Sequence, residues 1–123
     1  MSTRITIIGA GPGGYTAAFE AARAGADVTL VESAHLGGTC LNCGCVPTKT
    51  LKASAEALET ARRAAEFGLT GACDLTVDMP AVVARKRRVT ETLRGGLEKT
   101  CAKLKVRVLK GRGQVVSASL VRV

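Results

Sequence analysis

The chain has 123 residues, of which 46% are hydrophobic and 2% aromatic, and its formal net charge at pH 7 is +8. This composition excludes a disordered chain and suffices for one domain with an aliphatic core. No apolar run approaches the roughly 20 residues of a transmembrane helix, and no secretory signal is recognisable, so we expect no membrane partner. Five cysteines, three of them within six residues, favour a cytoplasmic chain with thiol or metal chemistry over a secreted disulfide framework.

The first part of the chain predicts a strand–helix–strand unit. Residues 3–8 are β-branched and apolar, which is typical of a buried parallel strand. An alanine-rich helix follows from Pro12 to residue 24, with proline in the first turn and Gly25 directly after its end. Residues 27–31 form a second strand that ends at Glu32, and together these elements predict one βαβ unit.

The rest of the chain predicts two long helices and three short strands. We expect a helix over residues 50–66, ended by Gly68, and a second helix over about 79–104. Asp78 is the expected N-cap of the second helix, with Pro80 in its first turn and a disturbance at Gly95–Gly96. Strands are expected over residues 106–110, 114–117 and 120–123. The predicted fold class is α/β, a Rossmann-like parallel sheet with long helices, incomplete because the chain stops inside a strand pattern.

The glycine loop after the first strand fits a dinucleotide-binding fingerprint. In Gly9-x-Gly11-x-x-Gly14, Gly9 permits the tight turn, Gly11 lets the backbone approach a pyrophosphate, and Gly14 lets the helix pack on the strand. A pyrophosphate would lie at the helix N-terminus, and Glu32 would accept from ribose hydroxyls. Glycines that serve only a tight turn are the alternative, and the fingerprint does not separate FAD from NAD.

Three cysteines follow in the segment 37–49, GGTCLNCGCVPTK. Clustered thiols beside a nucleotide loop indicate that two electrons pass between a disulfide and a redox cofactor. A zinc site from Cys40, Cys43, Cys45 and His35 is the rival, but the ligands are crowded, no second pair follows, and His35 is expected on a surface loop. The basic run 85–88 raises nucleic-acid binding as a further alternative. It lacks interleaved aromatic residues, so a solvated helix face is favoured.

Segment 37–49 resembles the active-site segment of the flavin-dependent disulfide reductases, and within this family it is most similar to the dihydrolipoamide dehydrogenases. The resemblance covers most of the chain and implies FAD as cofactor with NAD as co-substrate. It implies that Cys40 and Cys45 are the redox pair, with Cys40 the interchange thiol and Cys45 the thiol beside the flavin. Together, fingerprint and resemblance give this cofactor-binding set: Gly9, Gly11, Pro12, Gly14, Glu32, Gly37, Gly38, Thr39, Lys49 and Gly113.

The same resemblance implies an activity and partners. The full-length enzyme would be a homodimer that oxidises dihydrolipoamide on the lipoyl carrier domain of a 2-oxoacid dehydrogenase or glycine cleavage complex. Electrons would pass through the disulfide and FAD to NAD. Residues 1–123 would be the N-terminal part of the FAD-binding domain, without the NAD-binding and interface domains, so this chain alone is expected to be inactive. A mercuric or glutathione reductase-like enzyme and a non-catalytic flavin-binding module remain alternatives.

The other cysteines carry smaller expectations. Cys43 departs from the family pattern, and we interpret it as a packing substitution because a free cysteine behaves as a small hydrophobe. Cys73 and Cys101 lie outside any motif and are expected to be buried or half-buried thiols. A thiol of the redox pair placed at a helix N-terminus is expected to have a lowered pKa.

Overall fold

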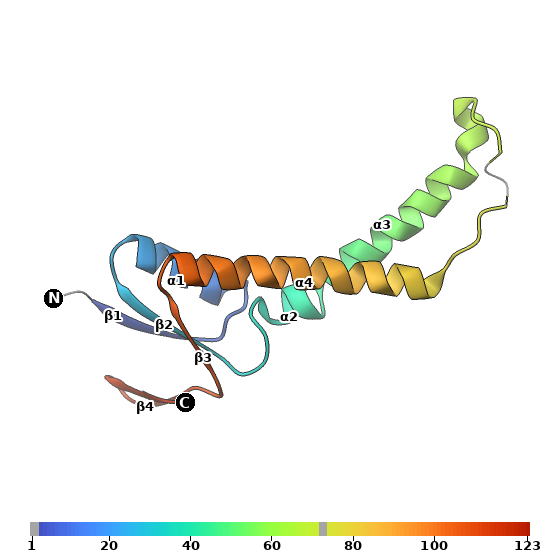
Figure 1. The fold of residues 1–123 in the computed structure, drawn as a ribbon. Coiled ribbons are helices and arrows are strands. Elements are labelled where there is room, and N and C mark those ends of the chain that lie inside the picture. Colours follow the sequence, from blue (N-terminus) through green and yellow to red (C-terminus); the bar gives the residue numbers. More distant parts are fainter. Residues whose placement is uncertain (1–2, 72–73) are drawn as a thin grey trace.

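The computed structural model describes residues 3–71 and 74–123 and contains a three-stranded parallel sheet at one end of the molecule (Figure 1). The strands β1 (Arg4–Ile8), β2 (Asp27–Glu32) and β3 (Arg107–Lys110) lie in the order β1-β2-β3. All three run in one direction, with Ile8 opposite Val31 and Glu32 opposite Lys110. Their carboxyl ends therefore meet at one edge, which confirms the predicted Rossmann-type α/β sheet.

Helix α1 (Pro12–Arg23) connects β1 to β2 and ends as predicted. Gly25 has a φ of 88°, a left-handed conformation that glycine adopts without steric cost. The N–H of Gly25 donates to the carbonyl of Ala22, and the N–H of Ala26 donates to the carbonyl of Ala21, both at 3.0 Å. This Schellman pattern satisfies the last carbonyls of the helix and turns the chain directly into β2.

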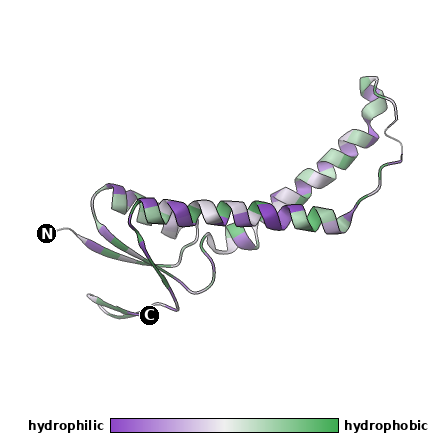
Figure 2. Ribbon diagram, viewed as in Figure 1, coloured by the Kyte–Doolittle hydropathy of each residue, from purple (hydrophilic) through white to green (hydrophobic). Residues whose placement is uncertain are grey.

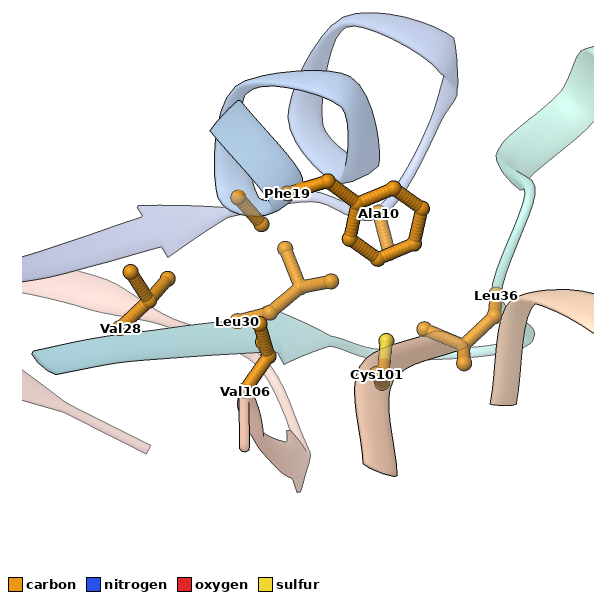
Figure 3. Packing of buried hydrophobic residues seen from close by; sticks show 8 residues of the cluster. Ala10, Phe19, Val28, Leu30, Leu36, Cys101 and Val106 are labelled. Atoms are coloured by element: carbon orange, nitrogen blue, oxygen red, sulfur yellow. The ribbon is translucent and has the colours of Figure 1, made fainter. Parts of the chain in front are cut away.

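The core lies between the sheet and one layer of helices (Figure 3). Leu30 and Val28 of the central strand are completely buried. They pack under Phe19 of α1 and Cys101 of α4 (Met79–Lys103), so both helices cover the same face of the sheet. Burying an aliphatic side chain of this size contributes about 1.5–3 kcal/mol. These contacts fix the glycine loop of β1 relative to the end of β2.

The opposite face of the sheet is only partly covered, which corrects one expectation. The sequence predicts a buried strand over residues 3–8, yet the residues of β1 alternate between exposed and half-buried, and Ile8 is 46% exposed. The reason is that helices pack on one face alone. A separate antiparallel hairpin of β4 (Gln114–Ser117) and β5 (Leu120–Arg122) follows β3, in agreement with the predicted strands.

The cysteine segment contains helices that begin earlier than predicted. A short helix α2 (Gly38–Asn42) was not expected, and α3 (Cys45–Arg62) starts five residues before the predicted residue 50. Pro47 is the third residue of α3, a position where the missing N–H would have no intrahelical partner. A 3-10 turn η1 (Ala64–Phe67) follows, and Gly68 closes it in the left-handed conformation.

Helix α4 begins as predicted but is not disturbed where expected. Asp78 is the N-cap, and its Oδ1 accepts from the Ala81 N–H at 3.0 Å. The helix runs without a break through Gly95–Gly96, because two glycines cost about 1 kcal/mol each while every backbone hydrogen bond can still form. Hydrophilic stretches lie along α4 (Figure 2), among them the basic run 85–88.

Helix α3 and the first half of α4 form a long arm that extends away from the sheet (Figure 1). Apolar side chains of this arm are exposed, with Phe67 at 67% and Met79 at 56%. Within residues 3–71 and 74–123, no helix combines the length and apolar character needed to cross a bilayer. Cys73, expected to be at least half-buried, lies outside the described residues.

Candidate active site

The glycine loop between β1 and α1 has the geometry that its spacing predicts. Gly9 has a φ of 95°, and its N–H donates to the carbonyl of Val31 at 2.8 Å. A Cβ built on Gly14 would overlap the carbonyl oxygen of Gly9, so only glycine permits this close packing of helix on strand. Both the tight turn and the close approach are therefore present.

Gly11 differs from its two neighbours in the fingerprint. It is the N-cap of α1 with an ordinary φ of −69°, and a Cβ built on it would meet no atom within 4 Å. Protein sterics therefore do not require glycine here. Open space lies beside the positive end of α1, where Pro12 is the first residue of the helix. An anionic ligand that approaches the backbone closely fits this space.

Glu32 ends β2 and closes the loop from the other side. Its Oε2 accepts from the Ala10 N–H and its Oε1 from the Ala34 N–H, both at 2.8 Å. Desolvation of Glu32 would raise the pKa of its carboxyl, but the hydrogen bonds from Ala34, Ala10 and Ser33 together lower the pKa below its usual value. Glu32 is therefore held as a carboxylate next to the glycine loop. Glu32 and Gly11 therefore lie at the same edge of the sheet, the arrangement that a dinucleotide fingerprint needs.

A cleft of about 240 Å³ opens at the carboxyl ends of β1 and β2. A Cβ built on Gly113 would approach the Ile8 side chain to 3.1 Å, so the segment after β3 lies against the end of β1. The structure thus brings Gly113 to the same cleft as Glu32, although the two are far apart in the sequence. The cleft is lined by Ile8, Gly9, Val31, Glu32, Ser33, Gly111, Arg112 and Gly113.

A second glycine pair places the cysteine segment against this loop. The Gly37 N–H donates to the carbonyl of Ala10 at 2.8 Å, and Gly37 has a φ of 95°. Gly38 has a φ of 58°, and a Cβ built on it would lie 2.7 Å from the Cα of Gly11. Two backbones thus pass each other with no room for a side chain. This contact joins the two predicted motifs into one site.

A sharp turn between α2 and α3 brings Cys45 back to Cys40. The Thr39 carbonyl accepts from the N–H groups of Cys43, at 2.9 Å, and Gly44, at 2.7 Å. A Cβ built on Gly44 would lie 3.2 Å from the Thr39 oxygen, so a larger residue would push the two segments apart. Gly44 is absent from the residue set that the sequence predicts, although its position between two cysteines was the available signal.

The two thiols of the predicted redox pair are neighbours. A hydrogen bond with the Cys45 thiol, and then desolvation, raise the pKa of the Cys40 thiol above its usual value, whereas the positive charge of Lys49 acts to lower it. Lys49 lies one turn after Cys45 on α3. The expected lowering of the thiol pKa is therefore wrong for Cys40, because a nearby second thiol outweighs the cation.

Comparison with known proteins assigns the family. The model for the pyridine nucleotide-disulphide oxidoreductases matches residues 3–122. The chain belongs to this family. It is 44% identical over 117 residues to dihydrolipoyl dehydrogenase of Chlamydia muridarum, which covers 95% of this chain and 25% of the relative. Dihydrolipoyl dehydrogenase of Geobacillus stearothermophilus is 42% identical over 123 residues, covering all of this chain and 26% of the relative.

Solved structures agree with this membership of the oxidoreductase family. LpdA from Mycobacterium tuberculosis superposes with a TM-score of 0.86 at 30% identity, over 94% of this chain and 25% of that chain. The HOCl-induced flavoprotein disulfide reductase RclA from Escherichia coli, in its Cu(II) complex, gives a TM-score of 0.71 at 31% identity. The match covers 95% of this chain and 24% of the RclA chain. The chain therefore spans about a quarter of the length of the relatives that it matches.

The remaining cysteines and the histidine of this chain take up different positions. Cys101 is buried as expected. Cys43 is exposed, so its interpretation as a packing substitution is wrong. His35 lies exposed on the loop after β2, as predicted. In the part of the chain that the structure describes, no group of three or more His, Cys, Asp or Glu side chains is placed to hold a metal ion.

Proposed function

We propose that this protein is the FAD- and disulfide-bearing part of a dihydrolipoamide dehydrogenase. The observation that carries the proposal is the contact of Gly38 with Gly11, which seats the thiol pair of Cys40 and Cys45 on the nucleotide loop. A thiol pair beside a dinucleotide site is the arrangement that disulfide–nucleotide electron transfer requires. The names of the two relatives described above support dihydrolipoamide as the substrate.

The residues at the edge of the sheet fit FAD. The open space beside Gly11 and Pro12 suits a pyrophosphate at the end of α1. Oε2 of Glu32 accepts one hydrogen bond, from the Ala10 N–H, which leaves this oxygen a lone pair for a ribose hydroxyl. The cleft beside Gly113 suits the adenine end. Gly9 and Gly14 would shape the loop, while Gly37, Gly38, Thr39 and Lys49 would lie along the flavin half of the cofactor.

Once the Cys40–Cys45 disulfide has formed, it can oxidise dihydrolipoamide by thiol–disulfide exchange without an external oxidant. A dihydrolipoamide thiolate attacks the Sγ of Cys40, the Cys40–Cys45 bond breaks, and Cys45 leaves as a thiolate. The second substrate thiolate then attacks the mixed disulfide, which releases Cys40 and oxidised lipoamide. The two electrons now reside on the Cys40–Cys45 dithiol. FAD, when bound, supplies a two-electron acceptor beside Cys45, with NAD as the final oxidant.

Partners and location follow from the same proposal. The dithiol substrate would arrive on a lipoyl carrier domain of a 2-oxoacid dehydrogenase or glycine cleavage complex, and the full-length enzyme would be a cytoplasmic homodimer. A mercuric or glutathione reductase-like enzyme and a non-catalytic flavin-binding module are the alternatives. The disulfide or dithiol that reacts at Cys40 separates a dihydrolipoamide dehydrogenase from a mercuric or glutathione reductase-like enzyme. Absence of thiol exchange would indicate the non-catalytic flavin-binding module.

Trapping the mixed disulfide tests the assignment. The chain is oxidised, its disulfide is mapped by mass spectrometry, and it is then reduced with dihydrolipoamide or glutathione. We expect a Cys40–Cys45 disulfide that dihydrolipoamide reduces faster than glutathione does. In the reduced Cys45→Ser variant, treatment with oxidised lipoamide is expected to give an adduct on Cys40, because the Cys40 thiolate attacks the lipoamide disulfide, whose ring opens to a mixed disulfide and one free thiol. The Cys40→Ser variant is the matched control with little adduct on Cys45. A dominant disulfide or adduct at Cys43 would contradict the proposal.

A further inference from the structure

Asn42, the last residue of α2, connects three separate segments through its side-chain amide. Its Nδ2 donates to the carbonyls of Leu36 at 3.0 Å and Gly38 at 2.8 Å. Its Oδ1 accepts from Arg94 of α4, from Nε at 3.1 Å and from Nη2 at 2.7 Å. Both donors and the acceptor oxygen of this amide are therefore used. The bonds join the loop before α2, the first turn of α2 and the middle of α4.

The pattern of these bonds requires an amide at position 42. The nitrogen faces two carbonyl oxygens, and the oxygen faces a guanidinium that can only donate. An aspartate would keep the Arg94 contact but would point a carboxylate oxygen at the carbonyls of Leu36 and Gly38. The two hydrogen bonds from Arg94 to Oδ1 of Asn42 are half-buried and charge-assisted. Such hydrogen bonds are about twice as strong as neutral ones.

Helix α2 has only five residues and cannot be stable by its own backbone hydrogen bonds. It nevertheless carries Cys40, whose position relative to Cys45 decides whether a disulfide forms easily. We propose that Arg94, acting through Asn42, is a positioning residue that holds α2 so that Cys40 stays beside Cys45. This inference rests on the proposed function of the cysteine pair, and it adds a residue that lies 49 positions beyond Cys45 in the sequence.

The expected consequence is a change in the dithiol–disulfide equilibrium. When the chain is oxidised by glutathione disulfide, Cys40 and Cys45 together lose two electrons and two protons, and two molecules of glutathione form. A fixed α2 raises the effective concentration of one thiol at the other and so favours the disulfide. Removing Arg94 lets α2 move, so the equilibrium constant against glutathione falls. Loss of one charge-assisted bond corresponds to a decrease of about tenfold, or about 30 mV for two electrons.

The experiment measures this equilibrium in glutathione buffers for the parent chain and for the Arg94→Ala, Arg94→Lys, Asn42→Ala and Asn42→Asp variants. Disulfide is quantified by alkylation and mass spectrometry in samples whose circular dichroism shows a folded chain. Arg85→Ala is the matched control. Arg85 is another arginine of α4, and its Nη1 donates to the carbonyl of Thr50 in α3 at 3.0 Å and not to a residue of α2.

We expect Arg94→Ala, Asn42→Ala and Asn42→Asp to lower the equilibrium constant of disulfide formation by about tenfold. Arg94→Lys should restore part of it, since a lysine donates to Oδ1 but not in bidentate fashion. Arg85→Ala should lose stability but leave the constant within about twofold, a difference that corresponds to less than 0.5 kcal/mol. If the parent forms the Cys40–Cys45 disulfide but Arg94→Ala leaves the equilibrium constant unchanged, this inference is overturned and the proposed function is not. The same holds if Arg85→Ala lowers the equilibrium constant as much as Arg94→Ala does. A parent that forms no Cys40–Cys45 disulfide overturns both the proposed function and this inference.

Discussion

The backbone N–H of Ala10 donates to the carboxylate of Glu32 at 2.8 Å, and this bond joins the end of β1 to the end of β2. Ala10 is completely buried, so water cannot replace the lost partner if the carboxylate is removed. The same carboxylate accepts from Ala34 at the start of the loop toward the cysteines. Glu32 therefore holds both predicted motifs in place before any ligand is considered.

Glu32→Gln is expected to destabilise the chain at pH 7. The amide can accept only with its oxygen, so one of the two backbone N–H groups loses its acceptor, at a cost of about 1–2 kcal/mol. Urea unfolding followed by circular dichroism measures this loss. Glu59→Gln, at an exposed position on α3, is the matched control and should stay within about 0.5 kcal/mol of the parent.

The destabilisation by Glu32→Gln should depend on pH. Hydrogen bonds keep the pKa of Glu32 lower in the folded chain than its unfolded value near 4.5. The stabilisation by the carboxylate is therefore fully present above the unfolded pKa and is lost as the pH falls through the folded pKa. The difference between parent and variant should be constant from pH 7 to pH 5.5 and should shrink below pH 4.5. A difference that grows on acidification would contradict the assigned direction.

Gly14→Ala and Gly13→Ala should have opposite effects on stability. The new Cβ at Gly14 would overlap the Gly9 carbonyl, so α1 must shift off β1, and we expect a loss of more than about 3 kcal/mol or no folding. At Gly13 a Cβ meets no atom within 4 Å, so the alanine should stabilise the helix by about 0.5–1 kcal/mol. Thermal melting measures both. A Gly14→Ala chain as stable as the parent would contradict the packing described here.

Local patterns in the sequence predicted most of the elements, because they are determined by neighbouring residues. The turn at Gly25, the N-cap at Asp78 and the parallel strands depend on short-range chemistry that a few residues express. The exposure of β1 was mispredicted because burial on the second face depends on what covers it, which a strand pattern does not contain. Helix α2 was missed because its five residues form a helix only with tertiary support.

The candidate site was predictable to the extent that its motifs are contiguous. Gly9–Gly14 and the cysteine segment could be recognised one at a time, but their contact through Gly38 and Gly11 depends on the fold. Arg94 could not be found from the sequence, since 52 positions separate it from its partner Asn42 and α4 contains many other basic residues. The exposure of Cys43 likewise follows from the turn at Gly44 and not from residue type.

Gly11→Ala separates the binding role of the glycine loop from its folding role. Because a Cβ at Gly11 meets no protein atom and its φ is ordinary, the variant should fold with a melting temperature close to that of the parent. The methyl group would occupy the space assigned to the pyrophosphate, so FAD affinity should fall at least about tenfold, the cost of one lost charge-assisted contact. Titration followed by flavin fluorescence measures it. An unchanged affinity, or no FAD binding by the parent, would contradict the fit of FAD to this loop.

Cys45→Ala should lower the pKa of Cys40 in the reduced chain. The hydrogen bond with the Cys45 thiol is the largest cause of the raised pKa, and without it only desolvation opposes the charge of Lys49. Cys40 would then ionise at lower pH, so its alkylation by iodoacetamide should reach half-maximal rate at lower pH than in the parent. Lys49→Ala in the same background should reverse part of this shift, because the favourable positive charge is removed.

Cys43→Ala is the matched control, since Cys43 is exposed and is not among the groups that shift the pKa of Cys40. If Cys43→Ala moved the profile as far as Cys45→Ala, the functional pair would have to include Cys43, and the assignment of Cys40 and Cys45 as partners would fail.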